Sequence, residues 1–329
     1  GVWVPWAVWE AYGDLDALAA SYPTMTAHLD HVATLLTPDG LWEGSFQYAD
    51  WLDPTAPPSD PFKAVADPGV VATACLFRSA DLTARTARLL GDAAGAERYQ
   101  AYADRLKDAF NEHYVDADGR VRSDCPTVYS LAICFGLLPA DKQEWAGARL
   151  AELAAANGYR VATGFAGTPF VLPALTMTGH VGTAYRLLLE QECPSWLYPV
   201  TMGATTIWER WDSMLPDGTI NPGQMTSFNH YAFGAVADWL HTTVGGLSAL
   251  EPGFRRVLIA PQPGGGLTWA RTSLDSPYGK VSVEWRLTDG VTTVDVQLPD
   301  GVTGVFRAPD GSESDLAAGP VTLHIPTTQ

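Results

Sequence analysis

The spacing of apolar residues changes near position 245, and this change divides the chain into two parts. Before it, apolar residues recur every three or four positions, which is the period of a helix with one buried face. The segment 14–36 shows this spacing in Leu15, Leu18, Tyr22, Met25, Leu29 and Val32. After it, short runs alternate apolar and polar side chains, as strands do when one face is buried. The sequence therefore predicts a helical domain at 1–246 and a β-rich domain at 247–329.

Further segments of the first part share the helical spacing. They are 70–90, 93–114, 142–156, 170–178, 181–190 and 227–244. Turns that contain Gly or Pro separate them, such as Thr37-Pro38-Asp39-Gly40. About nine helices are expected in all, and many antiparallel helical hairpins in series indicate a toroid rather than a compact bundle.

The second part has the pattern of an antiparallel β-sandwich. Five β-rich runs are expected at 256–260, 281–287, 291–298, 302–307 and 321–325. Between them lie turns such as Asp289-Gly290 and Pro309-Asp310-Gly311. Short strands at regular spacing with such turns are typical of a sandwich.

Charge and length limit the partners. The 329 residues include 20 Lys and Arg against 37 Asp and Glu, so the net charge is −17. A phosphate backbone or an anionic membrane surface is repelled by such a field, so we expect neither nucleic acid nor membrane as a partner. No apolar run approaches the roughly 20 residues of a membrane span.

The four cysteines form no CxxC pair and have no metal-ligand spacing with His. We interpret them as buried free thiols, which favours a cytoplasmic location over secretion. The acidic residues do not form a calcium loop of the EF-hand type, and no metal or cofactor is expected. The chain opens at Gly1 without a Met, so we expect a fragment or a processed form, and a native signal peptide stays open.

Three segments combine aromatic and acidic residues. The first, 39–61, contains Trp42, Glu43, Tyr48, Asp50, Trp51 and Asp53. Sugar sites need this mixture, because apolar sugar faces lie on aromatic rings while carboxylates bind the hydroxyls. The alternative interpretation is a structured turn with its Trp in the core.

The second segment, 203–217, places Trp208, Glu209, Arg210, Trp211 and Asp212 in succession. Adjacent residues point in different directions, so these five cannot all face one pocket. Either one carboxylate forms a structural ion pair with the Arg, or it is a general base that the Arg keeps ionised.

The third segment, 225–241, places Asn229, His230 and Tyr231 at the expected start of an apolar helix. A His at a helix start can be purely structural. Two further stretches, 164–169 and 124–127, are interpreted as rim loops of the helical domain with a structural role.

Four motifs in order resemble one family. GATTIWERWDS followed by MTSFNHYAFGAVADWLH is similar to the glycoside hydrolases that act as α-L-rhamnosidases, and DWLDP and ATGFAGTPFVLPAL resemble the same family. The resemblance covers residues 1 to about 244, and the trailing β-region looks like the family's C-terminal sandwich. It implies a mainly α, (α/α)6-barrel glycosidase that removes α-L-rhamnose with inversion at the anomeric carbon.

The resemblance also implies roles for particular residues. Glu209 in IWERW matches the general base, while His230, Trp51 and Asp67 match positions that hold the rhamnose. Asp50 and Trp208, beside these motifs, are further candidate contacts to the substrate, which would be a rhamnose-containing glycoside or oligosaccharide.

One part of the family pattern is absent. The family's general acid lies in a DERxGW-like stretch upstream of the GVxVPW phrase with which this chain opens, and no such stretch occurs here. An (α/α)6 barrel has twelve helices, so the domain is expected to lack its first helices. We therefore expect the acid on an upstream segment, and an N-terminal segment or self-association to cover the gap. If the acid lies within this sequence, Asp50 and Asp53 are the first candidates.

Two alternatives stay open. One is another (α/α)6 glycosidase or a polysaccharide lyase, although a lyase needs basic groups for its uronate substrate and the motifs here are acidic. The other is a non-catalytic, rhamnose-binding remnant, which the absent acid motif favours.

Overall fold

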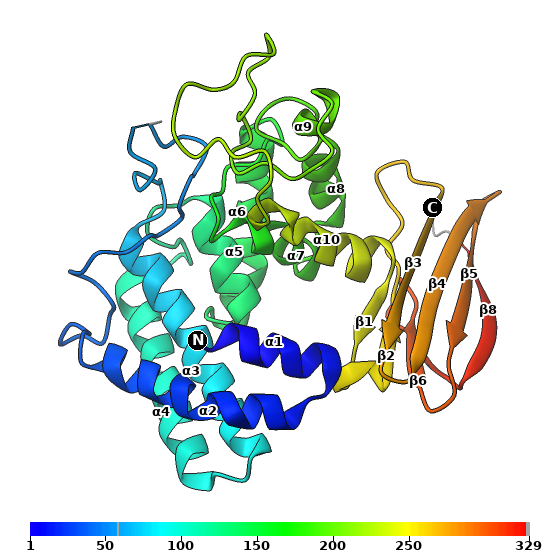
Figure 1. Ribbon diagram of the computed structural model, residues 1–329, viewed down its shortest axis with the longest axis horizontal. Coiled ribbons are helices and arrows are strands. Elements are labelled where there is room, and N and C mark those ends of the chain that lie inside the picture. Colours follow the sequence, from blue (N-terminus) through cyan, green and yellow to red (C-terminus); the bar gives the residue numbers. More distant parts are fainter. Residues whose placement is uncertain (58, 327–329) are drawn as a thin grey trace. The chain divides into compact units, whose positions relative to one another are not determined.

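The computed structural model describes residues 1–57 and 59–326 (Figure 1). One position of the segment 39–61 and the last three residues of the β-rich domain therefore lie outside the described residues. The chain forms two compact units, residues 26–236 and residues 1–25 together with 237–329. The division falls within helix α2 (Leu15–Ala33) and at the start of α10 (Val236–Trp239).

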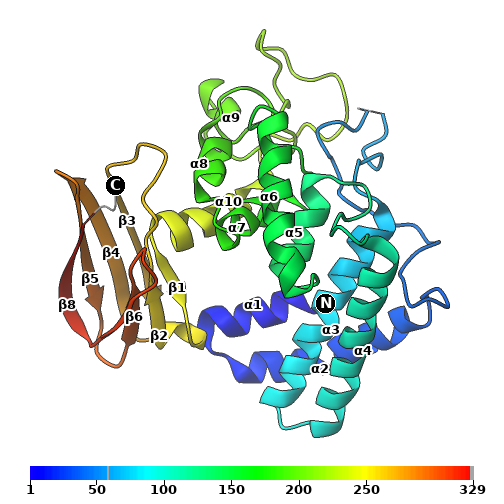
Figure 2. The same cartoon turned by 180° about the vertical axis from the view of Figure 1, so that it is seen from behind.

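The unit 26–236 is built from three helical hairpins in series. They are α3 (Pro68–Leu89) with α4 (Ala93–Tyr114), α5 (Pro126–Phe135) with α6 (Ala140–Ala156), and α7 (Thr168–Met177) with α8 (Val181–Leu189). The first helix of each hairpin packs on the first helix of the next, α3 on α5 and α5 on α7. Figure 2 shows α3 beside α4 and α5 beside α6. This is the repeat of an (α/α) toroid, with an inner and an outer helix in each hairpin.

Composition explains which helix of a hairpin lies inside. Nine of the ten residues of α5 and fifteen of the 22 residues of α3 are buried, whereas only eight of 22 are buried in α4. A helix that is apolar all round must be covered on every side, while an amphipathic one covers others and faces water. The hydroxyls of the buried residues Thr83 and Thr86 donate hydrogen bonds to the carbonyls of Ser79 and Leu82, one turn earlier in α3.

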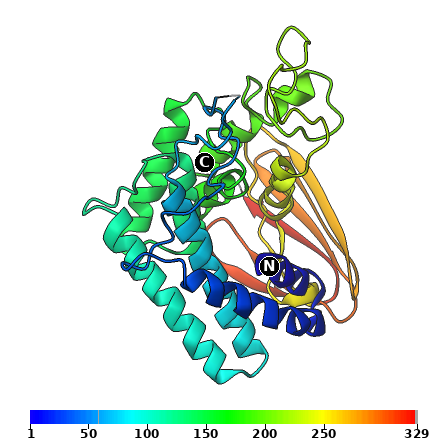
Figure 3. The ribbon, with the colours of Figure 1, turned by 60° about the vertical axis from the view of Figure 1, so that its left-hand side comes forward.

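The second unit contains α1 (Trp3–Tyr12) and two four-stranded sheets (Figure 3). One sheet has the order β1 (Leu247–Ala249), β2 (Arg256–Ile259), β6 (Thr303–Arg307), β7 (Glu313–Leu316). The other has the order β3 (Trp269–Ser276), β4 (Gly279–Thr288), β5 (Val291–Leu298), β8 (Gly319–Pro326).

The alternation in β4 produces the core of this unit. Val281, Val283 and Trp285 are buried, and the residues between them are only partly covered. A Cβ on Gly304 of β6 would lie 3.3 Å from Cδ1 of Leu298 of β5, so the two sheets face each other closely. The alternation in the sequence predicts the buried face of β4.

The prediction of a mainly helical chain with a C-terminal β-sandwich is confirmed, with local differences. Helix 93–114 has the predicted bounds, but residues 227–231 are not helical, and 232–244 form short 3-10, α and π turns. No bounds were predicted for the helices α1 and α5, and the helix α9 (Leu197–Thr201) and the strands β1, β3 and β7 were not predicted. The pairing of β2 with β6 is parallel, so the sandwich is not entirely antiparallel as expected. Among the described residues, no helix combines the length and apolar character needed to cross a bilayer.

Candidate active site

Glu209 lies at the base of a long loop, on a stem in which two backbone segments are hydrogen-bonded to each other. Its backbone N–H donates to Ser227 O at 2.9 Å, and the backbone N–H of His230 donates to Ile207 O at 2.8 Å. These bonds hold 207–209 antiparallel to 227–230. The backbone N–H of Ser227 also donates to Oε2 of Glu209 at 3.2 Å. One carboxylate oxygen is thereby anchored, in a side chain that is only 14% exposed.

His230 faces the other oxygen of this carboxylate. Its Nε2 lies 4.0 Å from Oε1 of Glu209. Its Nδ1 accepts a hydrogen bond from the backbone N–H of Ala232 at 3.3 Å, so in the neutral ring the proton resides on Nε2. A separation of 4.0 Å exceeds a direct hydrogen bond and leaves room for a bridging hydroxyl or water.

Two aromatic rings stack on the His230 imidazole. Phe165 stacks on it at 5.2 Å and 30°, and Tyr231 stacks at 5.1 Å and 12°. Phe165 also meets Phe233 edge to face at 5.2 Å. The ring orientation is therefore determined by packing as well as by the bond to Ala232 N.

The loop that carries Trp51 is joined to the loop that carries Phe165. The Trp51 carbonyl accepts from Phe165 N at 2.8 Å. The Asp50 carboxylate accepts from the backbone N–H groups of Gly164 at 2.8 Å and Gly167 at 2.9 Å. A further bond comes from the hydroxyl of Thr127, at the start of α5. These contacts fix both loops on the hairpin scaffold.

Asp50 itself is fully buried. Burial raises the pKa of its carboxyl to about 6, while the bonds from Thr127, Gly164 and Gly167 act in the opposite direction. Both oxygens are engaged and neither reaches solvent, so the geometry disfavours the expected sugar contact and gives Asp50 a structural role.

Asp53, the other candidate acid, is also buried, at 4% exposure. One oxygen accepts from the backbone N–H and hydroxyl of Thr55 at 2.8 and 2.7 Å, and the other accepts from Val65 N at 3.2 Å. Its carboxylate shapes the loop. The geometry therefore disfavours Asp50 and Asp53 alike as acids that meet a substrate.

Arg210 does not pair with Glu209, and here the structure corrects the sequence interpretation. Its Nε lies 2.9 Å from Oδ1 of Asp212, and its Nη2 lies 3.2 Å from Oδ2. Asn221 Nδ2 donates to the same Oδ2 at 2.8 Å. The Arg therefore forms a structural ion pair two residues along the chain, and the group that faces Glu209 is His230.

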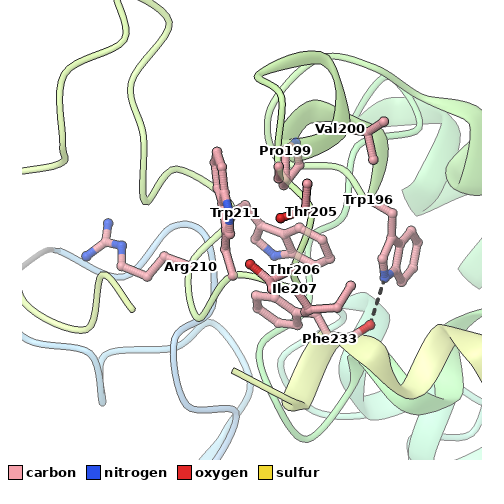
Figure 4. Close-up of a pocket in the computed structure, with 11 residues that line it drawn as sticks. Trp196, Pro199, Val200, Thr205, Thr206, Ile207, Arg210, Trp211 and Phe233 are labelled. Carbon is pink, nitrogen blue, oxygen red and sulfur yellow. Dashed lines mark hydrogen bonds between the residues drawn. The ribbon is translucent and has the colours of Figure 1, made fainter. Parts of the chain in front are cut away.

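Trp208 is buried, at 3% exposure, and meets Phe228 edge to face at 5.1 Å. It forms part of the wall of an apolar cavity of about 330 Å³ (Figure 4). In the same wall Trp211 stacks on Phe233 at 3.9 Å, and Trp196 Nε1 donates to the Phe233 carbonyl at 3.1 Å, drawn as a dashed line in Figure 4. Trp208 thus supports the loop that carries Glu209.

Asp67 belongs to a second polar cluster. It caps α3, with Oδ1 accepting from Gly69 N at 2.8 Å and Val70 N at 3.3 Å. Its Oδ2 lies 3.9 Å from Nη1 of Arg122, which also donates to Oε1 of Glu43 at 3.2 Å. One oxygen is therefore committed to the helix, and the other lies near a cation.

Arg122 and Phe165 are not among the site residues that were predicted from the sequence. Phe165 lies in the stretch GFAGTP, which was interpreted as structural, and its contact with a motif 65 positions away could not be seen. Within the described residues no group of three or more His, Cys, Asp or Glu side chains could hold a metal ion.

Helical hairpins in series carry a partly buried carboxylate that faces a His. The glycoside hydrolases built on helical hairpins share this type of scaffold, and the family comparison assigns the chain to that class. Residues 1–244 match the bacterial alpha-L-rhamnosidase six-hairpin glycosidase domain, and residues 246–319 match the bacterial alpha-L-rhamnosidase C-terminal domain. The chain belongs to the bacterial α-L-rhamnosidase family.

Relatives of known name agree with this assignment. An α-L-rhamnosidase of Streptomyces avermitilis is 40% identical over 310 residues, which are 94% of this chain and 29% of that protein. The native α-L-rhamnosidase structure from Aspergillus terreus has a TM-score of 0.95 and 38% identity, over 98% of this chain and 38% of that one. The Streptomyces avermitilis enzyme complexed with L-rhamnose has a TM-score of 0.89 and 36% identity, over 98% of this chain and 32% of that one. The chain thus spans 29% to 38% of the length of these relatives.

Proposed function

We propose that this chain is the part of an inverting α-L-rhamnosidase that supplies the general base, and that Glu209 is this base. The observation that carries the proposal is the pair formed by Glu209 and His230 at 4.0 Å. Family membership gives the reaction class, and the relative solved with L-rhamnose supports a terminal α-L-rhamnoside as substrate.

In this mechanism water attacks the anomeric carbon of rhamnose while Glu209 removes its proton. The glycosidic bond breaks, and the aglycone oxygen takes a proton from an acid on the opposite side of the sugar. An inverting pair of carboxyl groups is about 6.5–9.5 Å apart, which leaves room for the water. Because Ser227 N orients Oε2, the free Oε1 would take the proton, and the Nε2–H of His230 would donate to a sugar hydroxyl.

The other residues that were expected to contact the substrate have different roles in this proposal. Trp51, half-buried, would lie against an apolar face of the sugar, and Asp67 would accept from a hydroxyl through its Oδ2. Asp50 and Trp208 would act indirectly, because both are buried and support the loops that carry Trp51 and Glu209.

We infer that the general acid comes from sequence outside these 329 residues. The acid motif of the family does not occur in the chain, and the candidates Asp50 and Asp53 are buried with their oxygens engaged. An upstream segment of the same protein is the expected source.

The test is Glu209→Gln in the complete gene product, assayed on an aryl α-L-rhamnoside. Loss of a general base lowers the rate roughly 10²–10⁴-fold while the circular dichroism spectrum is retained. Proton NMR of the first rhamnose released should show the β-anomer. Turnover close to that of the wild type would contradict the assignment of Glu209 as the general base. Release of the α-anomer as the first product would contradict an inverting mechanism. Rhamnose binding by the wild type without any release of product would favour the non-catalytic alternative.

A further inference from the structure

Arg122 faces the carboxylate of Asp67 across a gap that fits one hydroxyl group. Its Nη1 lies 3.9 Å from Oδ2 of Asp67, which exceeds a direct hydrogen bond. An oxygen about 2.8 Å from both atoms fits between them, as a bridging water does between two polar groups. The oxygen of a hydroxyl group in this place donates to the carboxylate and accepts from the guanidinium.

Three contacts hold the Arg122 guanidinium in place, although the side chain is 46% exposed. Nη1 donates to Oε1 of Glu43 at 3.2 Å, and Nη2 donates to the His113 carbonyl at 3.2 Å. The guanidinium carbon also lies 4.6 Å from the centre of the Tyr114 ring, a cation–π distance. Because a guanidinium has five N–H donors, Nη1 has a second N–H beyond the one that binds Glu43.

The carboxylate of Glu43, which binds Arg122, is itself fixed. The Tyr114 hydroxyl donates to its Oε1 at 2.7 Å. A Cβ on Gly69, in the first turn of α3, would lie 2.7 Å from Cγ of Glu43, so only a glycine lets this side chain lie so close to the helix. The cation beside Asp67 is therefore held by a prearranged partner.

A strained turn connects the cation to Asp67. The backbone N–H of Asp67 donates to the Ser123 hydroxyl at 2.8 Å. Ser123 and Asp124 have left-handed φ values of 76° and 41°, and Arg149 holds the Asp124 carboxylate through two bonds of 3.0 and 2.8 Å. Such backbone strain persists only where the surroundings enforce it, and it is common at functional sites. The turn places Ser123 and the neighbouring Arg122 against the same Asp67.

We propose that Arg122 is a substrate-binding residue that shares one sugar hydroxyl with Asp67, so that the pair selects sugars with a hydroxyl at that position. The inference rests on the proposed function, in which Oδ2 of Asp67 accepts from a hydroxyl of rhamnose, and it adds a residue that determines specificity. A sugar without this hydroxyl leaves two charged groups without a partner, so it binds more weakly.

The experiment measures kcat/KM of the complete gene product on 4-methylumbelliferyl α-L-rhamnoside and on its 2-deoxy, 3-deoxy and 4-deoxy analogues. Arg122→Met should lower kcat/KM about 10- to 100-fold on the rhamnoside and on two analogues, the loss of one hydrogen bond to a charged group. On the analogue that lacks the shared hydroxyl the loss should be no more than about twofold. Comparison of variants on the same substrate cancels the intrinsic reactivity of each analogue.

Asp67→Asn tests whether the two residues bind the same hydroxyl. Asn caps a helix as well as Asp does, so α3 keeps its N-terminus. This variant should spare the same analogue that Arg122→Met spares. If the two variants spare different analogues, or if Arg122→Met lowers kcat/KM equally on all four substrates, the shared hydroxyl is wrong.

Arg98→Met is the matched control. Arg98 also binds a carboxylate, that of Asp30 at 2.7 Å, and its guanidinium carbon lies 5.2 Å from the centre of the Tyr99 ring. The control should leave kcat/KM within about twofold on every substrate, because Arg98 lies outside the candidate site.

A second measurement does not depend on hydrolysis. Calorimetry of Glu209→Gln with methyl α-L-rhamnoside and its three deoxy analogues should show that added Arg122→Met weakens binding about 10-fold or more for all but one ligand. This pattern without any cleavage by the wild type would contradict the proposed function and keep the shared hydroxyl. Cleavage by the wild type with equal losses on all ligands would overturn the shared hydroxyl alone. Rhamnosides that are neither bound nor cleaved would overturn both.

Discussion

The carboxylate of Asp50 accepts a hydrogen bond from the backbone N–H of Gly164 at 2.8 Å, across 114 positions of sequence. The carbonyl of the next residue, Trp51, accepts from Phe165 N. Ala49 and Leu52, on either side, adopt left-handed backbone with φ of 52° and 56°. Such conformations cost about 1–3 kcal/mol each and persist only where the surroundings enforce them. They turn Asp50 inward while Trp51 stays half-buried, so a buried carboxylate positions an aromatic ring of the candidate site.

This arrangement predicts a distinctive pH dependence. The unfolded carboxyl titrates near 3.8, and burial raises the pKa of folded Asp50 to about 6. Between these values the folded state holds more protons, so the free energy of unfolding falls as pH rises. The contribution is complete below about pH 4 and is lost through pH 6, and two pKa units correspond to on the order of 3 kcal/mol.

Asp50→Asn isolates this contribution, because the amide does not titrate. The amide has one acceptor oxygen fewer than the carboxylate, so one buried N–H is left unpaired. This lowers the free energy of unfolding by about 1–3 kcal/mol at any pH. Urea denaturation from pH 4 to 7 should show the free-energy difference, wild type minus variant, decreasing with pH. A constant difference would mean that Asp50 keeps an ordinary pKa in the fold.

The close approach at Gly164 gives a second prediction. A Cβ at this position would lie 2.3 Å from the Asp50 carbonyl oxygen and 2.4 Å from that of Trp51. Both are backbone atoms that cannot rotate away, so Gly164→Ala should destabilise the chain by about 1–3 kcal/mol or more. In the complete gene product it should also weaken rhamnoside cleavage, since the Trp51 loop must shift.

Gly182→Ala is the matched control. Gly182 lies within α8, and a Cβ there meets nothing within 4 Å. Replacing a helical Gly by Ala stabilises by up to about 1 kcal/mol. Thermal unfolding should therefore move in opposite directions for the two variants, and a shared direction would contradict the steric account of Gly164.

The helices that sequence periodicity found and missed differ in a simple physical way. Helix α4 has one buried face, and its predicted bounds, 93–114, agree with the structure. In α5 nine of ten residues are buried, so no polar face marks a period. At 227–231 the backbone is held instead by the stem bonds to Glu209 and Ile207, which override the helical pattern of the local sequence.

The candidate site, like the fold, could be predicted only in part from the sequence. The motifs around Glu209 and His230 could be singled out because each is aromatic and polar within a few residues. Which side chains meet could not be predicted, because the decisive contacts are long-range or depend on orientation. Arg210 is adjacent to Glu209 yet pairs with Asp212, and Phe165 stacks on His230 from a loop that looked structural.

A third prediction concerns the β-rich unit. Trp285 of β4 is fully buried, and its Nε1–H donates to the Val244 carbonyl at 2.7 Å. Trp285→Phe leaves that buried carbonyl unpaired and creates a small cavity, so it should cost about 2–4 kcal/mol. Trp269→Phe, on the 55% exposed side chain of β3, should stay within about 0.5 kcal/mol in urea denaturation. Equal costs would contradict both the cavity expected at Trp285 and the contribution of its hydrogen bond to Val244.

The last prediction tests whether Phe165 positions His230. Phe165→Leu keeps an apolar side chain but removes the ring that stacks on the imidazole at 5.2 Å. If His230 must hold a sugar hydroxyl opposite Glu209, a small displacement in the complete gene product should lower kcat/KM by up to about 10²-fold on an aryl α-L-rhamnoside. Tyr231→Phe retains the second ring that stacks on the imidazole and should leave kcat/KM within about twofold, which makes it the matched control. Thermal unfolding distinguishes positioning from general damage, because Phe165→Leu should lower the melting temperature by only a few degrees. Activity of Phe165→Leu equal to that of Tyr231→Phe would show that the Phe165 ring is not needed to orient His230.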